Sequence, residues 1–261
     1  MTAAEARHLT DPDYWDAHWR SVELPVTVDV QGNRTFRAFH RVFRRFLPDG
    51  KNASYSLAEI GCTPGRWLIY FAREFGYQVS GCDSSEMGLA ITKANLEMSG
   101  VQPSDLWLWD IEEADTSKTE AFDLVVSLGV VEHFQNPLPV ISNHVSMLKE
   151  GGYLVLEVPN LRGANGIVQS WINPEKLRLH TTTIMSRSWF GDVATRFGLR
   201  VVYLDYVAGF EPVALSPNDD KWRKILSVLL RGLWRARSPL SFLDSLNNPL
   251  FSGYIMAIYT K

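Results

Sequence analysis

The sequence predicts an α/β protein with a doubly wound, mostly parallel seven-stranded sheet, an antiparallel C-terminal strand pair and a helical cap. Two observations lead to this prediction. Five short apolar runs alternate with longer helical patterns, which is typical of a parallel sheet covered by helices on both faces. Towards the C-terminus the alternation stops, and two further strand-like runs flank a long stretch that contains several prolines.

Two helices are expected before the sheet begins, over residues 11–20 and 34–47, and the second carries phenylalanines on one face. Residues 48–52 then break the chain with proline, glycine and asparagine. The first five strands and the helices between them follow in this order: strand 56–61, helix 65–75, strand 77–82, helix 85–99, strand 105–109, strand 122–127, helix 137–149 and strand 153–158.

The C-terminal part is expected to close the sheet. A helix over 186–197 leads to a strand over 199–207, and a last strand covers 249–259. The simplest topology pairs these two strands at one sheet edge, with the residues between them as an excursion over a sheet end. We therefore expect one domain in four segments: N-terminal helices or a lid over 1–53, a Rossmann-like core over 54–208, a helical cap over 209–248 and a final core strand over 249–261.

Composition excludes several classes of protein. With 261 residues, 46% of them hydrophobic and 21% charged, the chain is an ordinary globular protein and not a disordered, collagen-like or rod-shaped one. No stretch reaches the ~18 apolar residues of a membrane span, and the N-terminus lacks the features of a secretory signal. Cys62 and Cys82 are too few for a disulfide framework and lack zinc-site spacing. These features predict a cytoplasmic protein without metal ligands.

Charge is unevenly distributed along the chain. Residues 34–47 hold five arginines and no acid, residues 221–237 hold six basic residues and no acid, and the remainder carries −14. This balance argues against a dedicated nucleic-acid binder, and no nucleic-acid partner is expected. Residues 221–237 also carry Leu, Ile and Trp at helical spacing. They predict either a cap helix packed on the sheet end, or an amphipathic helix that makes weak contact with an anionic membrane surface or binds another partner.

The segment from Leu57 to Arg66 is the most informative one, because a strand runs through a glycine turn directly into a helix. Such a turn lets a ligand approach backbone N–H groups at the positive end of the helix dipole. Asp83 and Asp110 follow the next two strands, where acids can bind ribose hydroxyls and a further ligand group. A nicotinamide dehydrogenase would have G-x-G-x-x-G, but only Gly61 and Gly65 are present.

These segments together resemble the class I S-adenosylmethionine-dependent methyltransferases, in their small-molecule branch. E-I-G-C-T-P-G-R looks like the family's motif I, Asp83 matches its ribose-binding acid, and Asp110-Ile111 matches its adenine-binding pair. Residues 122–133 and 148–154 are similar to the motifs at the fourth and fifth strands. The resemblance implies that S-adenosyl-L-methionine is the cofactor and is bound by Glu59, Gly61, Cys62, Thr63, Gly65, Asp83, Ser84, Asp110, Ile111 and Ser127.

Thr63 departs from the family pattern, which usually has glycine in the middle of motif I. A β-branched residue disfavours positive φ and adds bulk beside the cofactor's methionine tail. Either the loop keeps negative φ at this position, or cofactor binding is impaired.

The resemblance implies methyl transfer to a small-molecule acceptor by in-line displacement, most simply onto oxygen. The first candidate base is His133, which follows the fourth strand and would have a near-neutral pKa, and the second is His180 in the loop after the fifth strand. Tyr14, Trp15 and Trp171 are candidate substrate-site residues. Each of these also has a structural explanation, because a buried histidine can bond only backbone and an aromatic side chain can simply pack.

Two other functions remain open from the sequence. One is methylation of RNA or protein, and the other is a methyltransferase-like binding or scaffold protein without catalysis, for which Thr63 is the only support. The sequence does not indicate an oligomeric state.

Overall fold

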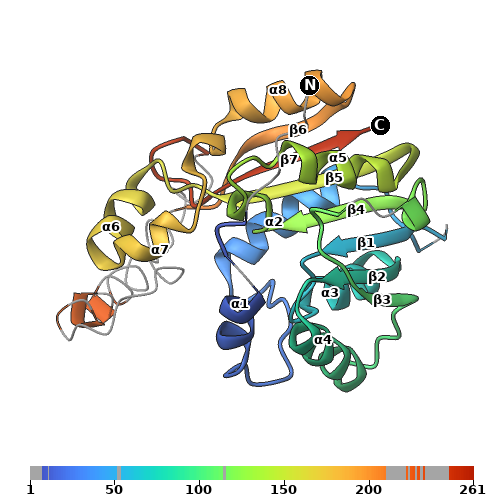
Figure 1. Ribbon diagram of the computed structural model, residues 1–261, viewed down its shortest axis with the longest axis horizontal. Coiled ribbons are helices and arrows are strands. Elements are labelled where there is room, and N and C mark those ends of the chain that lie inside the picture. Colours follow the sequence, from blue (N-terminus) through green and yellow to red (C-terminus); the bar gives the residue numbers. More distant parts are fainter. Residues whose placement is uncertain are drawn as a thin grey trace.

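The computed structural model of the chain describes residues 8–10, 12–51, 54–113, 116–209 and 247–261, together with isolated positions between 222 and 232. A seven-stranded sheet runs through it in the order β3-β2-β1-β4-β5-β7-β6 (Figure 1). Its strands are β1 (Ser56–Ile60), β2 (Gln78–Asp83), β3 (Asp105–Leu108), β4 (Phe122–Leu128), β5 (Leu148–Pro159), β6 (Arg200–Val207) and β7 (Tyr254–Thr260). Only β7 runs antiparallel to its two neighbours, β5 and β6, which confirms the predicted mixed sheet.

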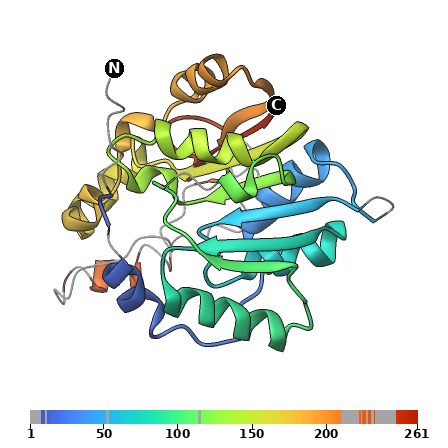
Figure 2. The same cartoon turned by 45° about the vertical axis from the view of Figure 1, so that its right-hand side comes forward.

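Helices cover both faces of this sheet (Figure 2). They are α1 (Pro12–Trp19), α2 (Arg34–Phe46), α3 (Arg66–Phe75), α4 (Glu86–Met98), α5 (Leu138–Met147), α6 (Ala164–Ile172), α7 (Pro174–Arg178) and α8 (Arg187–Phe197). Side chains of α5 and α8 belong to one core cluster, and those of α2 and α3 belong to the other. The sheet therefore lies between two helical layers.

Strand alternation explains why there are two cores. In β5, Leu154 and Leu156 pack into the cluster under α5 and α8, whereas Val155 between them packs into the cluster under α2 and α3. All three side chains are fully buried. Successive side chains of a strand point to opposite faces, so a strand buried on both faces reads as a continuous apolar run. This is the pattern seen in the sequence.

The order of the strands reverses between β1 and β4, which are neighbours although β2 and β3 lie between them in the chain. In open α/β sheets ligands bind at such a point, outside the carboxyl ends of the strands. Figure 1 shows α1 and the α6–α7 pair beyond that end of the sheet. The fold therefore leaves a crevice whose walls come from strand ends, the N-terminal segment and the loops after β4 and β5.

The elements agree with the sequence expectation to within a few residues, with three exceptions. β5 begins at Leu148 instead of 153, β7 begins at Tyr254 instead of 249, and α6 and α7 had no predicted counterpart. The predicted cap over 209–248, and the surface contact through 221–237, lie outside the described residues except at a few positions. Among the described helices, none combines the length and apolar character that a membrane span requires.

Candidate functional site

A cavity of about 230 Å³ lies at the carboxyl ends of β1, β2 and β4. It contains most of the predicted cofactor residues. The lining residues are His8, Thr10, Trp15, Trp19, Glu59, Ile60, Gly61, Thr63, Arg66, Trp67, Cys82, Asp83, Ser84, Trp109, Asp110, Ile111, Leu128, Gly129, Val130, His133 and Phe134. We call this space the first cavity.

The glycine turn after β1 forms the floor of the first cavity. Gly61 has a φ of +69°, and a Cβ there would lie 2.6 Å from Val130 Cγ2. Gly65, with a φ of +85°, is the residue before α3 and provides no side-chain cap for that helix. Glycine is needed at both positions, since left-handed backbone is costly for other residues. The turn thus leads directly into α3 at the edge of the cavity, and Gly65 leaves the first N–H groups of that helix without a side-chain cap.

Thr63 is accommodated in this turn without left-handed backbone. It is not among the described non-glycine residues with positive φ, which are Glu120 and Ala208. A Cβ at Gly88 in α4 would lie 2.4 Å from Thr63 Oγ1, so the threonine side chain lies against that glycine. Of the two sequence alternatives, the structure therefore has the one in which the loop keeps negative φ.

Glu59 and Arg66 place opposite charges at one end of the first cavity. Glu59 is buried, and its Oε2 has no hydrogen-bond partner within the described part of the chain. Burial raises the pKa of Glu59 well above its usual value, and the nearby Arg66 guanidinium opposes that rise. Arg66 was not selected from the sequence, although its place at the first position of α3, directly after the glycine turn, was a usable signal. A ligand with an ammonium and a carboxylate group would match this pair.

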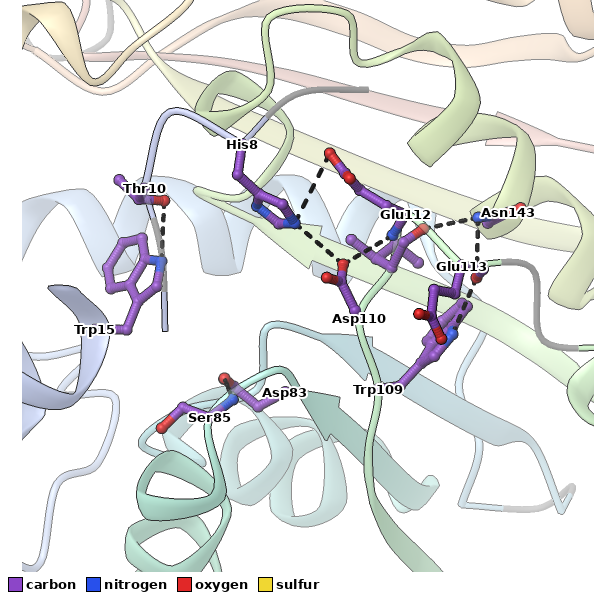
Figure 3. A network of polar contacts seen from close by, with 11 residues as sticks. His8, Thr10, Trp15, Asp83, Ser85, Trp109, Asp110, Glu112, Glu113 and Asn143 are labelled. Carbon is purple, nitrogen blue, oxygen red and sulfur yellow. Dashed lines mark hydrogen bonds and ion pairs between the residues drawn. The ribbon is translucent and has the colours of Figure 1, made fainter. Parts of the chain in front are cut away.

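Two acids follow neighbouring strands on the other side of the first cavity (Figure 3). Asp83 accepts hydrogen bonds from the backbone N–H of Ser85 at 3.0 Å and of Thr63 at 3.3 Å. Burial raises the pKa of Asp83, while these hydrogen bonds lower it. Asp110 lies 3.1 Å from His8 Nε2. The N-terminal segment thus crosses the cavity at Asp110, a contact that the sequence did not indicate.

The same N-terminal segment and α1 form a wall of the first cavity. The backbone N–H of Leu9 donates to His133 O at 2.7 Å, and Trp15 Nε1 donates to Thr10 Oγ1 at 3.1 Å (Figure 3). The Trp15 ring also packs edge-on against the His133 ring, with centroids 5.1 Å apart. Trp15, a candidate substrate-site residue, therefore lines the first cavity next to the candidate base His133.

A second cavity, also of about 230 Å³, adjoins the first at Gly129. Its lining includes Glu132, Lys176 and His180. The His133 and His180 rings, predicted independently as catalytic candidates, lie with their centroids 4.7 Å apart at the boundary between the cavities. The structure therefore brings both histidines together.

Burial changes the protonation of these groups. It lowers the pKa of His133 to about 3 and also lowers the pKa of His180. The structure thus differs from the expected near-neutral pKa of His133, because desolvation disfavours the charged imidazolium. Burial also raises the pKa of the Glu132 carboxyl to about 8.

Five predicted site residues lie outside both cavity linings: Gly65 before α3, Cys62, Ser127, Tyr14 and Trp171. Cys62 packs into the core, where its Sγ would be 2.8 Å from a Cβ at Gly81, and Ser127 is a buried β4 residue outside both cavity linings. Tyr14 is next to Trp15 but does not line either cavity, and Trp171 is 64% exposed on α6. Strand and helix positions alone did not reveal which way these side chains point.

Comparison with known proteins identifies the family. The family of methyltransferase domains matches residues 31–204 of this chain. The tRNA U34 carboxymethyltransferase of Desulfotalea psychrophila is 31% identical over 147 residues, which cover 56% of this chain and 45% of that protein. The ubiquinone biosynthesis O-methyltransferase of Ruegeria sp. is 27% identical over 152 residues, covering 57% of this chain and 59% of that protein. The chain thus matches about half the length of these curated relatives.

Solved structures share the fold. A SAM-dependent methyltransferase from Archaeoglobus fulgidus superposes with a TM-score of 0.55 and 18% identity, covering 95% of this chain and all of that one. Phosphoethanolamine N-methyltransferase 2 of Haemonchus contortus, in complex with S-adenosyl-L-methionine, superposes with a TM-score of 0.59 and 16% identity, covering 96% of this chain and 57% of that one.

Proposed function

The chain belongs to the family of methyltransferase domains, and we propose that it transfers a methyl group from S-adenosyl-L-methionine to an oxygen atom of a small-molecule acceptor. The observation that carries the proposal is the first cavity, where the glycine turn of β1 and the acids after β2 and β3 face one space. The non-catalytic alternative loses its support, since Thr63 keeps negative φ and lies against Gly88.

The residues of the first cavity fit this cofactor. Any Cβ at Gly61 would lie against Val130 at the floor of the cavity. Glu59 Oε2, which is buried and has no hydrogen-bond partner among the described residues, suits the ammonium of a methionine group. Arg66 suits its carboxylate, Asp83 the ribose hydroxyls, and Asp110 with Ile111 the adenine. The cofactor supplies a sulfonium-activated methyl group, so the protein needs only to bind, orient and exclude water. Orientation of this kind can lower a barrier by ~7–11 kcal/mol.

The second cavity is the proposed acceptor site. It joins the first cavity at Gly129, so an acceptor there would approach the cofactor's reactive end. His133 is neutral at pH 7 because of its lowered pKa, and it would accept a hydrogen bond from an acceptor hydroxyl rather than carry a full proton. The cavity volume of about 230 Å³ suits a small molecule, and the O-methyltransferase relatives favour oxygen as the methylated atom.

RNA is the second candidate acceptor, because one relative is a tRNA U34 carboxymethyltransferase. A filter-binding assay with bulk tRNA at low and moderate salt tests this candidate. Salt-sensitive tRNA binding followed by label incorporation into RNA would replace the small-molecule proposal.

Calorimetric titration with S-adenosyl-L-methionine tests the cofactor site. Asp83→Ala should weaken binding by about 1.5–3 kcal/mol, roughly 10- to 150-fold, the range for a hydrogen bond that involves a charged group. Asp105→Ala is the matched control, since Asp105 pairs with Lys118 at the start of β3 and outside the first cavity. No binding by the wild type, or equal affinity in both variants, would refute this site.

A further inference from the structure

Three side chains with metal-binding groups converge at the boundary between the two cavities. Glu132, His133 and His180 each offer one ligand atom, and these atoms all lie within 4.8 Å of one another. His133 Nε2 is 3.9 Å from Glu132 Oε1. Two ligands of a tetrahedral ion, each about 2.1 Å from it, are about 3.4 Å apart. Small side-chain rotations would therefore suffice to form a shared site.

Hydrogen bonds already orient both imidazoles for this role. His133 Nδ1 lies 2.8 Å from Leu179 O, and His180 Nδ1 lies 2.8 Å from Lys176 O. A carbonyl oxygen can only accept, so each Nδ1 carries the proton and each neutral ring presents its Nε2 lone pair. Histidines that bind metals almost always donate their other N–H to such a carbonyl or carboxylate.

Glu132 provides an independent reason to expect an ion. The residue is 1% exposed, and its Oε2 has no hydrogen-bond partner among the residues that the structure describes. A buried carboxyl oxygen without a hydrogen bond is costly, and binding a metal ion is one way to satisfy it. A bound ion would provide the Glu132 carboxyl group with this missing partner.

We propose that Glu132, His133 and His180 form a binding site for a divalent transition-metal ion. Two imidazoles and one carboxylate suit Zn²⁺ or Fe²⁺, whereas Mg²⁺ and Ca²⁺ prefer oxygen ligands alone. The spacing of Cys62 and Cys82 in the sequence predicted no metal ligands. These three ligands come from two loops that meet only in the folded chain.

Three protein ligands leave open coordination positions, as in catalytic metal sites. Glu132 Oε1 would be 3.7 Å from a Cβ at Gly129, and Gly129 lines both cavities. The open positions therefore face the proposed acceptor. A role in catalysis rests on the proposed function. With the ion bound, His133 Nε2 would bind the metal instead of accepting from the acceptor hydroxyl, and a hydroxyl bound to the ion would release its proton to solvent more readily, because a metal lowers the pKa of the oxygen it binds.

Lys176 opposes a cation at this site. It lines the second cavity together with Glu132 and His180, so its positive charge lies close to the proposed ion. Removing this charge while keeping the aliphatic stem should therefore strengthen metal binding. Lys176→Met makes that change.

Titration of chelator-treated, full-length protein with Zn²⁺ tests the proposal, with Co²⁺ as a spectroscopic probe of the ligand set. The wild type should bind one equivalent. His180→Ala and the nearly isosteric Glu132→Gln should weaken Zn²⁺ binding at least tenfold, since even changes beyond the ligands cost about 10- to 100-fold. Lys176→Met should bind Zn²⁺ more tightly than the wild type.

His8→Ala is the control variant, because His8 lies within 4 Å of Asp110 and Glu112 and so belongs to a second group of one imidazole and two carboxylates. It should leave Zn²⁺ affinity unchanged. The proposal is overturned if the wild type shows no stoichiometric Zn²⁺ or Co²⁺ binding, or if binding is lost in His8→Ala and kept in His180→Ala.

Titration of the same variants with S-adenosyl-L-methionine separates this inference from the proposed function. Retained cofactor affinity in His180→Ala and Glu132→Gln shows that they are folded, so their loss of Zn²⁺ supports the site. A wild type that binds Zn²⁺ but no S-adenosyl-L-methionine would keep the metal site and refute the proposed function.

Discussion

The two halves of the ligand end of the sheet are built in different ways. At β1, β2 and β3 each ligand-facing residue lies at or just after its own strand end, as Gly61, Asp83 and Asp110 do. After β4, the position of His133 depends on a carbonyl 46 residues away, that of Leu179. The Thr181 N–H also donates to Glu132 O at 2.7 Å. The first half is therefore encoded locally, and the second is assembled by the fold.

This difference explains which site residues a sequence reveals. A strand end fixes a side chain's position within a few residues, so a short motif is enough. An assembled site also needs two loops to meet, and that depends on the packing of elements far apart in the chain. Changes in the local half should thus weaken cofactor binding, and changes in the assembled half should leave cofactor binding intact.

A third buried imidazole, His144, sharpens the comparison because it lies in the core outside both halves. It donates Nδ1–H to Val140 O at 2.7 Å, and burial lowers its pKa from 6.5 to about 4. The unfolded chain therefore binds a proton first, and stability present above pH 6.5 is lost as the pH falls towards 4. In the wild type this decrease in the free energy of unfolding should be on the order of 3 kcal/mol, and His144→Leu should abolish it. Urea unfolding between pH 4 and 7.5 measures this decrease. If the free energy of unfolding depends on pH in the same way in His144→Leu as in the wild type, the lowered pKa of His144 is contradicted.

Gly61→Ala tests the local half. Alanine at position 61 would have to adopt left-handed backbone, and its Cβ would come too close to Val130. Stability should therefore fall by about 1–2 kcal/mol and cofactor affinity about tenfold or more. Gly100→Ala is the matched control: Gly100 has a φ of +68° and nothing within 4 Å of a Cβ. Gly100→Ala should lose about 1–2 kcal/mol of stability from the left-handed backbone alone and keep normal cofactor affinity. If both variants lost cofactor affinity equally, the loss in Gly61→Ala would come from general backbone strain and not from the position of Gly61 at the cavity.

Thr181→Val tests the assembled half. Thr181 Oγ1 donates to Phe134 O at 2.7 Å, and this bond ties the two loops together. Its removal should cost about 0.5–1.5 kcal/mol of stability and leave cofactor affinity unchanged. Chemical denaturation and calorimetry provide the two measurements. A fall in cofactor affinity as large as that of Gly61→Ala would show that the halves are coupled.

Thr63→Gly is the smallest expected change. Since Thr63 has negative φ and lies against Gly88, cofactor affinity should stay within about twofold. Stability should fall by less than about 1 kcal/mol, because glycine gives the unfolded chain more freedom. A large gain in affinity would instead indicate that the threonine side chain obstructs the cavity.

The sequence by itself determined the succession of strands and helices along the chain, the mixed sheet and the local half of the site. Continuous apolar runs such as Leu124–Val126 must be buried on both faces, and a glycine turn such as Gly61–Gly65 can follow a strand only in a few geometries. Those constraints act between neighbouring residues, so they can be read without the fold.

Only the tertiary structure decided the direction of buried side chains and the meeting of distant loops. Cys62 faces the core although its neighbours face the first cavity, and the pairing of His133 with His180 depends on the loop that begins after α7. The pKa of His133 follows from the same assembly, because desolvation is a property of everything packed around a group rather than of its own segment.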